Sequence, residues 1–282
     1  MADLRPMNFG EILDGSLVIY RRHFGLFLKL AVAALAVPVA LSVYFVFRFL
    51  ADLREAPLRA LLILVPVVLL YYVASLVMTA GTVRIIADSY LGRTPQFRDA
   101  LALGVSKIWP LVAVGIGKGL VLVLIIVATG VVAAIGVPLL RGAGGGVLVV
   151  ALVLAGIWLT IYVACGYGVT TPVVVLEELG SSFDAFGRSW ELTRGFKLKV
   201  LGLAIVTFLL CDTIPRQVFQ ALATALMPTS TGLGIALTVV SVAVPLVLAP
   251  VIASVITLMY YDLRVRREAF DLQVLGQQLG IV

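Results

Sequence analysis

The sequence has one histidine, two cysteines and few charged residues, and each shortage excludes a class of function. Because His23 is the only histidine, the chain cannot build a site that needs two imidazoles, such as an H-E-x-x-H zinc site. Cys165 and Cys211 lie inside apolar runs and form no C-x-x-C pair. We therefore expect both cysteines to be small, buried apolar side chains and not members of a disulfide framework. We therefore predict no metal site and no cofactor.

Charge is scarce because apolar residues take its place. Only 13% of the residues are charged and 62% are hydrophobic. In a typical soluble domain, about 25% of the residues are charged and about 45–50% are apolar. A membrane-spanning helix needs roughly 20 apolar residues. Six such runs are visible, at about 26–47, 58–82, 108–134 and 147–170, from about 200 onward, and at 233–260. We predict an all-α polytopic membrane bundle of six transmembrane helices with interfacial amphipathic helices.

The distribution of lysine and arginine predicts the orientation. With the N-terminus inside, 15 lysines and arginines fall in inner segments, five fall in outer connections and Lys118 lies within a run. The bias recurs in all four inner segments, so the positive-inside rule places both termini in the cytoplasm of a cell membrane. The net charge of +6 then reflects basic loops that face an anionic leaflet, and we expect no nucleic-acid partner.

The predicted partners are therefore the lipid bilayer, with anionic lipids on its cytoplasmic side, and a membrane protein as an alternative. Nine arginines in the inner segments are predicted to contact the membrane surface: Arg21, Arg22, Arg93, Arg98, Arg188, Arg194, Arg264, Arg266 and Arg267.

The inner segments resemble one another. Phe9, Phe97, Phe183 and Phe270 each begin an amphipathic stretch and are spaced by 88, 86 and 87 residues. The alternative is a chance likeness among amphipathic helices. We predict a threefold parallel repeat with units at about 8–92, 93–178 and 179–262, closed by an amphipathic helix at 263–280. All units belong to a single membrane domain, 1–282.

Helix-start signals accompany the first three stretches. Asn8 with Glu11 and Ser181 with Asp184 fit capping boxes, in which side chains satisfy free backbone N–H groups. Thr94 followed by Pro95 predicts an N-cap with proline at the first helical position.

Polar residues also occur inside the apolar runs. Lys118 lies about ten residues into the third run, roughly 15 Å deep, where a lysine costs at least ~2.5 kcal/mol. In the fifth run, Asp212 and Arg216 can pair at i,i+4, and Pro215 between them favours a kink or a stop. We hypothesise that Lys118 pairs with Asp212, giving an intramembrane polar site of Lys118, Asp212 and Arg216. The alternative is a structural ion pair or a lysine whose amine reaches the interface.

Paired carboxylates follow the fourth run, at Glu177 and Glu178. They could in principle serve acid–base chemistry, but the sequence has no nearby histidine and no G-x-S-x-G motif. We expect these carboxylates to pair with Arg188 or Arg194 or to cap a helix. No catalytic residue is predicted.

Three stretches together indicate a family. They are Leu4–Gly15 (LRPMNFGEILDG) with Tyr20–Phe24 (YRRHF), Ser189–Gly195 (SWELTRG), and Tyr260–Asp271 (YYDLRVRREAFD). The combination resembles the bacterial multi-pass family named for the glycerophosphodiester phosphodiesterase membrane domain. The resemblance implies six helices in the plasma membrane. Some relatives carry a fused phosphodiesterase domain that needs metal-binding carboxylates and histidines, so we do not expect the enzymatic activity in this chain.

Two functions follow from these features. The first is a non-catalytic plasma-membrane protein that organises lipids or partner proteins at the cytoplasmic leaflet. The alternative is a transporter or channel for a small anion or a lipid headgroup, with its polar site around Lys118. An intramembrane enzyme is the least favoured, because the sequence offers no nucleophile beside a base.

Overall fold

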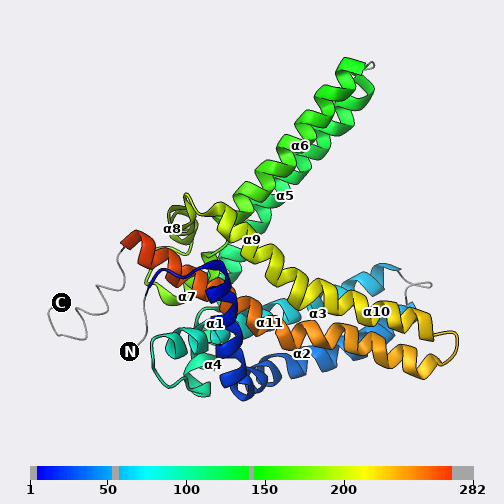
Figure 1. Cartoon of the computed structure of the whole chain (residues 1–282). Coiled ribbons are helices and arrows are strands. Elements are labelled where there is room, and N and C mark those ends of the chain that lie inside the picture. Colours follow the sequence, from blue (N-terminus) through cyan, green and yellow to red (C-terminus); the bar gives the residue numbers. More distant parts are fainter. Residues whose placement is uncertain (1–4, 53–56, 140–142, 269–282) are drawn as a thin grey trace. The chain divides into compact units, whose positions relative to one another are not determined.

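The structure is a computed structural model, and it describes residues 5–52, 57–139 and 143–268. Within these ranges every regular element is a helix (Figure 1). Among the described residues, six helical segments are long and apolar enough to cross a membrane: Phe24–Leu41, Val65–Tyr90, Ile108–Gly136, Gly145–Leu176, Lys197–Leu226 and Thr231–Glu268. The predicted all-α bundle with six spans is therefore confirmed.

The helices cluster into two compact units, which are described separately. The first unit comprises Met1–Trp109 and Gly202–Val282, and the second comprises Pro110–Leu201. The helices of the first unit are α1 (Phe9–Arg22), α2 (Phe24–Asp52), α3 (Pro57–Tyr90), α4 (Phe97–Ser106), η1 (Leu209–Thr213), α10 (Ile214–Leu226) and α11 (Thr231–Glu268). Two antiparallel pairs, α2 with α3 and α10 with α11, form its body, α1 packs on α11, and α4 packs on α3 (Figure 1).

Close helix contacts around glycines build the core of the first unit. A Cβ at Gly104 of α4 would lie 2.6 Å from the carbonyl oxygen of Val77 in α3, so only glycine permits this approach. A Cβ at Gly81 would lie 2.8 Å from a methyl group of Leu30. Around these contacts, Leu30 is packed with buried Phe27 and Ile85. The short helix α4 is thereby fixed to the α2–α3 pair.

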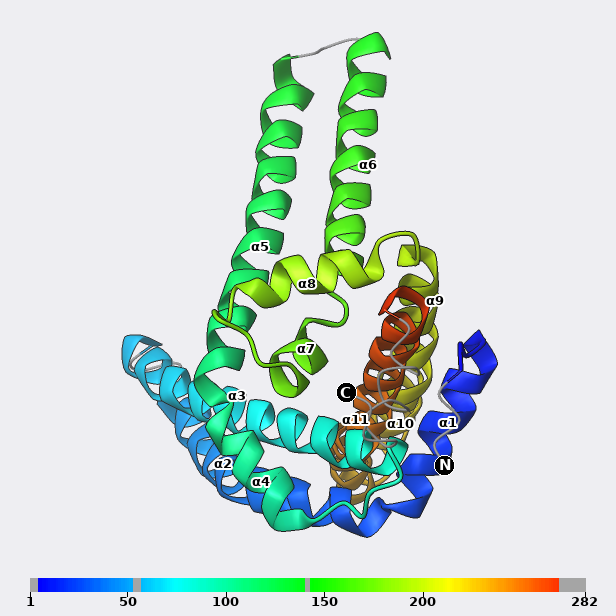
Figure 2. The same cartoon turned by 90° about the vertical axis from the view of Figure 1, so that its left-hand side faces the viewer.

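The second unit is built on one long hairpin. Its helices are α5 (Ile108–Leu139), α6 (Ala143–Gly166), α7 (Thr170–Leu176), α8 (Asp184–Thr193) and the first turn of α9 (Lys197–Phe208). Both views show α5 and α6 side by side, and α8 contacts the hairpin at α6 (Figure 2). Many apolar side chains of the hairpin, such as Leu120 and Leu154, are exposed. Such surfaces suit contact with lipid.

The predicted helix starts are partly confirmed. The capping box of Asn8 and Glu11 is present, and Glu11 Oε2 accepts the backbone N–H of Asn8 at 2.6 Å. The start predicted at Ser181 is wrong, because α8 begins at Asp184 with Phe183 as its N-cap, although Asp184 Oδ2 accepts the backbone N–H of Ser181 at 2.8 Å. The prediction of Thr94 as an N-cap is wrong, because α4 begins at Phe97 with Gln96 as its N-cap. Gln96 keeps an extended backbone, with φ −114° and ψ 138°.

The fifth span does not stop at Pro215. The five residues of η1 form a π-helical turn, in which the N–H of Ile214 bonds to the carbonyl of Leu209, and α10 continues the helix to Leu226. A proline clashes with the carbonyl four residues before it and cannot bond to it. The widened turn ahead of Pro215 accommodates both effects, as π-bulges do.

Only the order of the helices bears on the predicted repeat. The short helices α1, α4 and α8 each precede longer apolar helices; α1 and α4 begin at Phe9 and Phe97, and α8 begins one residue after Phe183. The fourth start, at Phe270, lies outside the described residues, as does most of 263–280, and 263–268 belongs to α11. The equivalence of the three units in space remains a prediction.

Candidate functional site

A site forms in the second unit where α8 is joined to the end of α6. Ser189 Oγ donates to the carbonyl of Gly166 at 2.8 Å, and Thr193 Oγ1 reaches the same carbonyl at 3.3 Å. Both hydroxyls are buried. A Cβ at Gly166 would lie 2.2 Å from Cε3 of Trp190, so the indole of α8 packs directly on the backbone of α6. The segment Ser189–Thr193 therefore positions Trp190 through three contacts with one residue.

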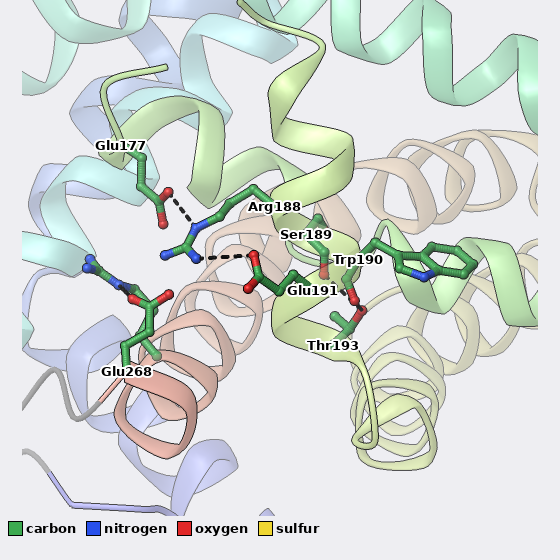
Figure 3. A network of polar contacts seen from close by, with 8 residues as sticks. Glu177, Arg188, Ser189, Trp190, Glu191, Thr193 and Glu268 are labelled. Atoms are coloured by element: carbon green, nitrogen blue, oxygen red, sulfur yellow. Dashed lines mark hydrogen bonds and ion pairs between the residues drawn. The ribbon is translucent and has the colours of Figure 1, made fainter. Parts of the chain in front are cut away.

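Aromatic rings surround Trp190. Tyr162 of α6 meets it edge to face at a centroid distance of 5.5 Å, and Tyr167 lies 5.9 Å away on the turn after α6. Tyr167 also packs edge to face on Phe186 at 4.9 Å. Aromatic pairs at these distances add stability beyond their buried area. Trp190 projects from α8 away from Arg188 and Glu177 (Figure 3).

Lys197, the first residue of α9, places its ammonium between two of these rings. Its Nζ lies 3.2 Å from the ring centroid of Tyr162 and 3.4 Å from that of Trp190. The same Nζ is buried and has no hydrogen-bond acceptor among the described residues. An ammonium carries three donors, and a buried charge is normally paired. The cation–π contacts offset part of the cost of burying this charge. The ammonium can therefore gain from an added hydrogen-bond acceptor.

A pocket of about 440 Å³ opens beside this lysine. We call it the α8–α9 pocket; its lining includes Tyr162, Trp190, Glu191, Arg194, Lys197 and Leu198. The turn between the helices depends on Gly195, whose φ of +84° is a left-handed conformation that favours glycine. The pocket thus combines two cations, one carboxylate and two aromatic rings.

The other side of α8 carries an ion pair. Arg188 Nε lies 2.9 Å from Glu177 Oε2, and its Nη1 lies 3.7 Å from Glu191 Oε2 (Figure 3). The predicted pairing of Glu177 with an arginine of this segment is confirmed. This ion pair ties α8 to the end of α7, and the predicted contact of Arg188 with the membrane surface stays a prediction.

The predicted intramembrane polar residues belong to different units. Lys118 Nζ donates to the carbonyl of Tyr167 at 3.3 Å, so it borders the same turn as the aromatic rings. In the first unit, Arg216 Nη2 lies 3.0 Å from Asp212 Oδ1, which confirms their i,i+4 pairing. The pairing of Lys118 with Asp212 stays a prediction, as does the three-residue polar site.

The remaining arginines predicted at the membrane surface fall into two groups. Arg264 pairs with Glu268 at 2.9 Å, and Arg266 pairs with Asp262 at 3.0 Å. The others are exposed: Arg21, Arg22, Arg93, Arg98, Arg194 and Arg267. Arg194 is the exposed arginine that also lines the α8–α9 pocket.

Sequence reasoning missed Lys197, Tyr162 and Trp190 as a group. The segment Ser189–Gly195 was noted only for its resemblance to a family motif. Tyr162 lies 28 residues before Trp190, on another helix. A signal was present, since aromatic and basic residues gather where membrane helices meet the interface. The contact of Lys197 with Tyr162 and Trp190 could not be predicted without the structure, because it depends on the packing of α8 at Gly166.

The six helical segments of membrane-spanning length make the chain a multi-pass membrane protein. The described residues contain no group of three or more His, Cys, Asp or Glu side chains placed to hold a metal ion. Comparisons of the chain with protein-family models, with curated proteins and with solved structures find no match.

Proposed function

We propose that this chain is a non-catalytic multi-pass protein of the bacterial plasma membrane that binds and organises anionic lipids through the α8–α9 pocket. The observation that carries the proposal is the buried ammonium of Lys197, which has ring faces around it and no acceptor among the described residues. The family resemblance of the three sequence motifs supports the same assignment to the plasma membrane.

The chemistry of the pocket suits a phosphate-bearing headgroup. The guanidinium of Arg194 can bind phosphate oxygens in a bidentate manner, and the ammonium of Lys197 can supply further charged donors. Tyr162 and Trp190 have the amphipathic character of residues at the membrane interface. The lining contains no serine, cysteine or histidine, which supports binding rather than catalysis.

The charge distribution supports a cytoplasmic location for the pocket. Ser189–Gly195 lies in an inner segment of the predicted topology, where basic residues outnumber those of the outer connections by 15 to five. The cytoplasmic leaflet is the one rich in anionic lipids. We therefore propose that both termini and the α8–α9 pocket face the cytoplasm.

A binding experiment tests this proposal. The full-length protein in detergent is titrated with short-chain phosphatidylglycerol and with phosphatidylcholine, and bound lipid is counted by native mass spectrometry. We expect tighter binding of phosphatidylglycerol and a loss of about tenfold in Lys197→Met, the effect of one charge-assisted hydrogen bond. Lys199→Met, two residues further along α9, is the matched control. Equal affinities of the two lipids, or equal losses in the two variants, contradict the proposal.

A second candidate function is transport of a small anion or headgroup past Lys118. It is favoured by one observation, the half-buried ammonium of Lys118 in an apolar span with a 3.3 Å contact to the carbonyl of Tyr167. Anion flux into proteoliposomes is the test. Transport predicts that Lys118→Met abolishes flux, whereas a structural lysine predicts no flux in either protein.

A further inference from the structure

An apolar groove runs between α2 and α11 in the first unit, with Tyr20 of α1 at one end. It has a volume of about 220 Å³. Phe27, Leu35 and Pro250 form a buried floor, with exposed fractions of 2% for Phe27 and 3% for Leu35. Leu28 and Val32 line it as exposed walls. A buried floor with exposed apolar walls is a surface that an apolar ligand can enter.

The groove is as long as the part of a lipid chain that lies in one leaflet. Its lining on α2 extends from Phe24 to Val39, which is about 22 Å at 1.5 Å per residue. One leaflet contributes about 15 Å to a hydrocarbon core roughly 30 Å thick. A chain that enters beside Phe24 can therefore remain in the groove through its leaflet.

The end of the groove at Tyr20 is fixed by a hydrogen bond. Tyr20 donates from its hydroxyl to the carbonyl of Val247 in α11 at 3.0 Å, and its ring packs on Phe24 and Phe27 at centroid distances of 5.5 and 6.0 Å. Because α1 is joined to α11 at this point, the groove is formed before any ligand binds. Such preorganisation favours a specific ligand over transient contact with bulk lipid.

Basic residues lie next to Tyr20, Phe24 and Leu28 of the groove in the sequence. Arg21 and Arg22 end α1, and Lys29 lies in the second turn of α2; all three are exposed. None of the three forms an ion pair with another described residue within 4.0 Å. The sequence from Gly15 to Leu50 contains no carboxylate. The segment that forms the α2 side of the groove therefore carries basic residues and no carboxylate.

We propose that the groove holds an acyl chain of an anionic phospholipid whose phosphate binds Arg21, Arg22 and Lys29. Cations beside an apolar groove match a molecule with an anionic head and an apolar tail. A second copy docked on this face by two-fold symmetry would place the same cations opposite one another, and like charges repel. The site is separate from the α8–α9 pocket and does not rest on it.

Filling the groove tests the proposal. Ala36 lines the groove and Ala33 does not, while both are exposed alanines of α2. We expect Ala36→Phe to weaken binding of long-chain phosphatidylglycerol about tenfold, because several methylenes lose their burial. Ala33→Phe should bind as the wild type does. The measurement is native mass spectrometry of the full-length protein titrated with dioleoyl phosphatidylglycerol.

A charge variant separates this site from general lipid binding. The double variant Arg21→Gln, Arg22→Gln should show a smaller preference for dioleoyl phosphatidylglycerol over dioleoyl phosphatidylcholine than the wild type. Its thermal stability should equal that of the wild type. Equal binding by the Ala36→Phe and Ala33→Phe variants overturns the proposal. So does a dimer that only Ala36→Phe disrupts in light scattering. Lys197→Met is measured in parallel, and its loss of short-chain lipid binding reports on the α8–α9 pocket alone.

Discussion

The carboxylate of Asp262 accepts the backbone N–H of Met7 at 2.7 Å, across a sequence separation of 255 residues. Arg266 completes the contact, since its Nε lies 3.0 Å from Asp262 Oδ1 and its Nη2 donates to the carbonyl of Met7 at 2.9 Å. Both polar groups of one peptide residue are thus held by α11. Asp262 is fully buried, so this carboxylate depends on its partners.

We predict that Asp262→Ala lowers the free energy of unfolding by about 3 kcal/mol, because removing one member of a buried pair leaves the other polar groups unpaired. The thermal unfolding midpoint in detergent measures the change, and hydrogen exchange at the amide of Met7 should accelerate. Glu268→Ala is the control, since the side chain of Glu268 is 20% exposed whereas that of Asp262 is fully buried, and its loss should cost less than that of Asp262. A wild-type midpoint for Asp262→Ala contradicts the prediction.

A second prediction concerns the turn after α6. Gly166→Ala places a Cβ 2.2 Å from the indole of Trp190, so the ring must move and the packing of α8 on α6 must open. Overpacking of this kind costs about 1–3 kcal/mol. The loss is measured as a lower unfolding midpoint with a shifted Trp emission maximum. Gly119→Ala, whose added Cβ meets no atom within 4 Å, should keep the wild-type midpoint or raise it.

Much of the architecture could be predicted from the sequence because local rules determine it. Apolar runs of membrane-spanning length become helices wherever lipid replaces water as the solvent. The contacts of Asn8 with Glu11 and of Asp212 with Arg216 join residues three and four positions apart, where helix geometry alone brings side chains together.

The candidate site could not be predicted in the same way. Lys197 meets Tyr162 and Trp190 only because Gly166 lets α8 pack on the end of α6, and no local rule gives that approach. Similarly, the hydrogen bond between Asp262 and the backbone N–H of Met7 joins residues that are 255 positions apart. The π-helical turn before Pro215 was missed because a proline in isolation predicts a break, whereas a widened turn lets the helix continue.

A third prediction uses the only histidine. Burial, and secondarily the charge of Arg22, lowers the pKa of His23 below its ordinary value of 6.5. The folded protein therefore favours neutral His23, whose Nε2 lies 3.1 Å from Ser89 Oγ. Its contribution to stability is full above pH 6.5 and declines as the pH falls through the lowered pKa. The unfolding midpoint should drop over this range in the wild type and drop less in His23→Gln.

The last prediction separates binding from stability at Lys197. Without lipid, Lys197→Met removes a buried charge that has no acceptor among the described residues, so the unfolding midpoint should rise slightly. Tyr162→Leu removes a ring face from the same ammonium, so the midpoint should fall, by roughly 1 kcal/mol for a lost cation–π contact. Added short-chain phosphatidylglycerol should stabilise the wild type more than Lys197→Met, because a ligand stabilises only the state that binds it and the variant has lost the ammonium of the α8–α9 pocket. A lower midpoint for Lys197→Met without lipid would mean that the cation–π contacts outweigh the cost of burying the ammonium, and Lys197 would then need no added acceptor.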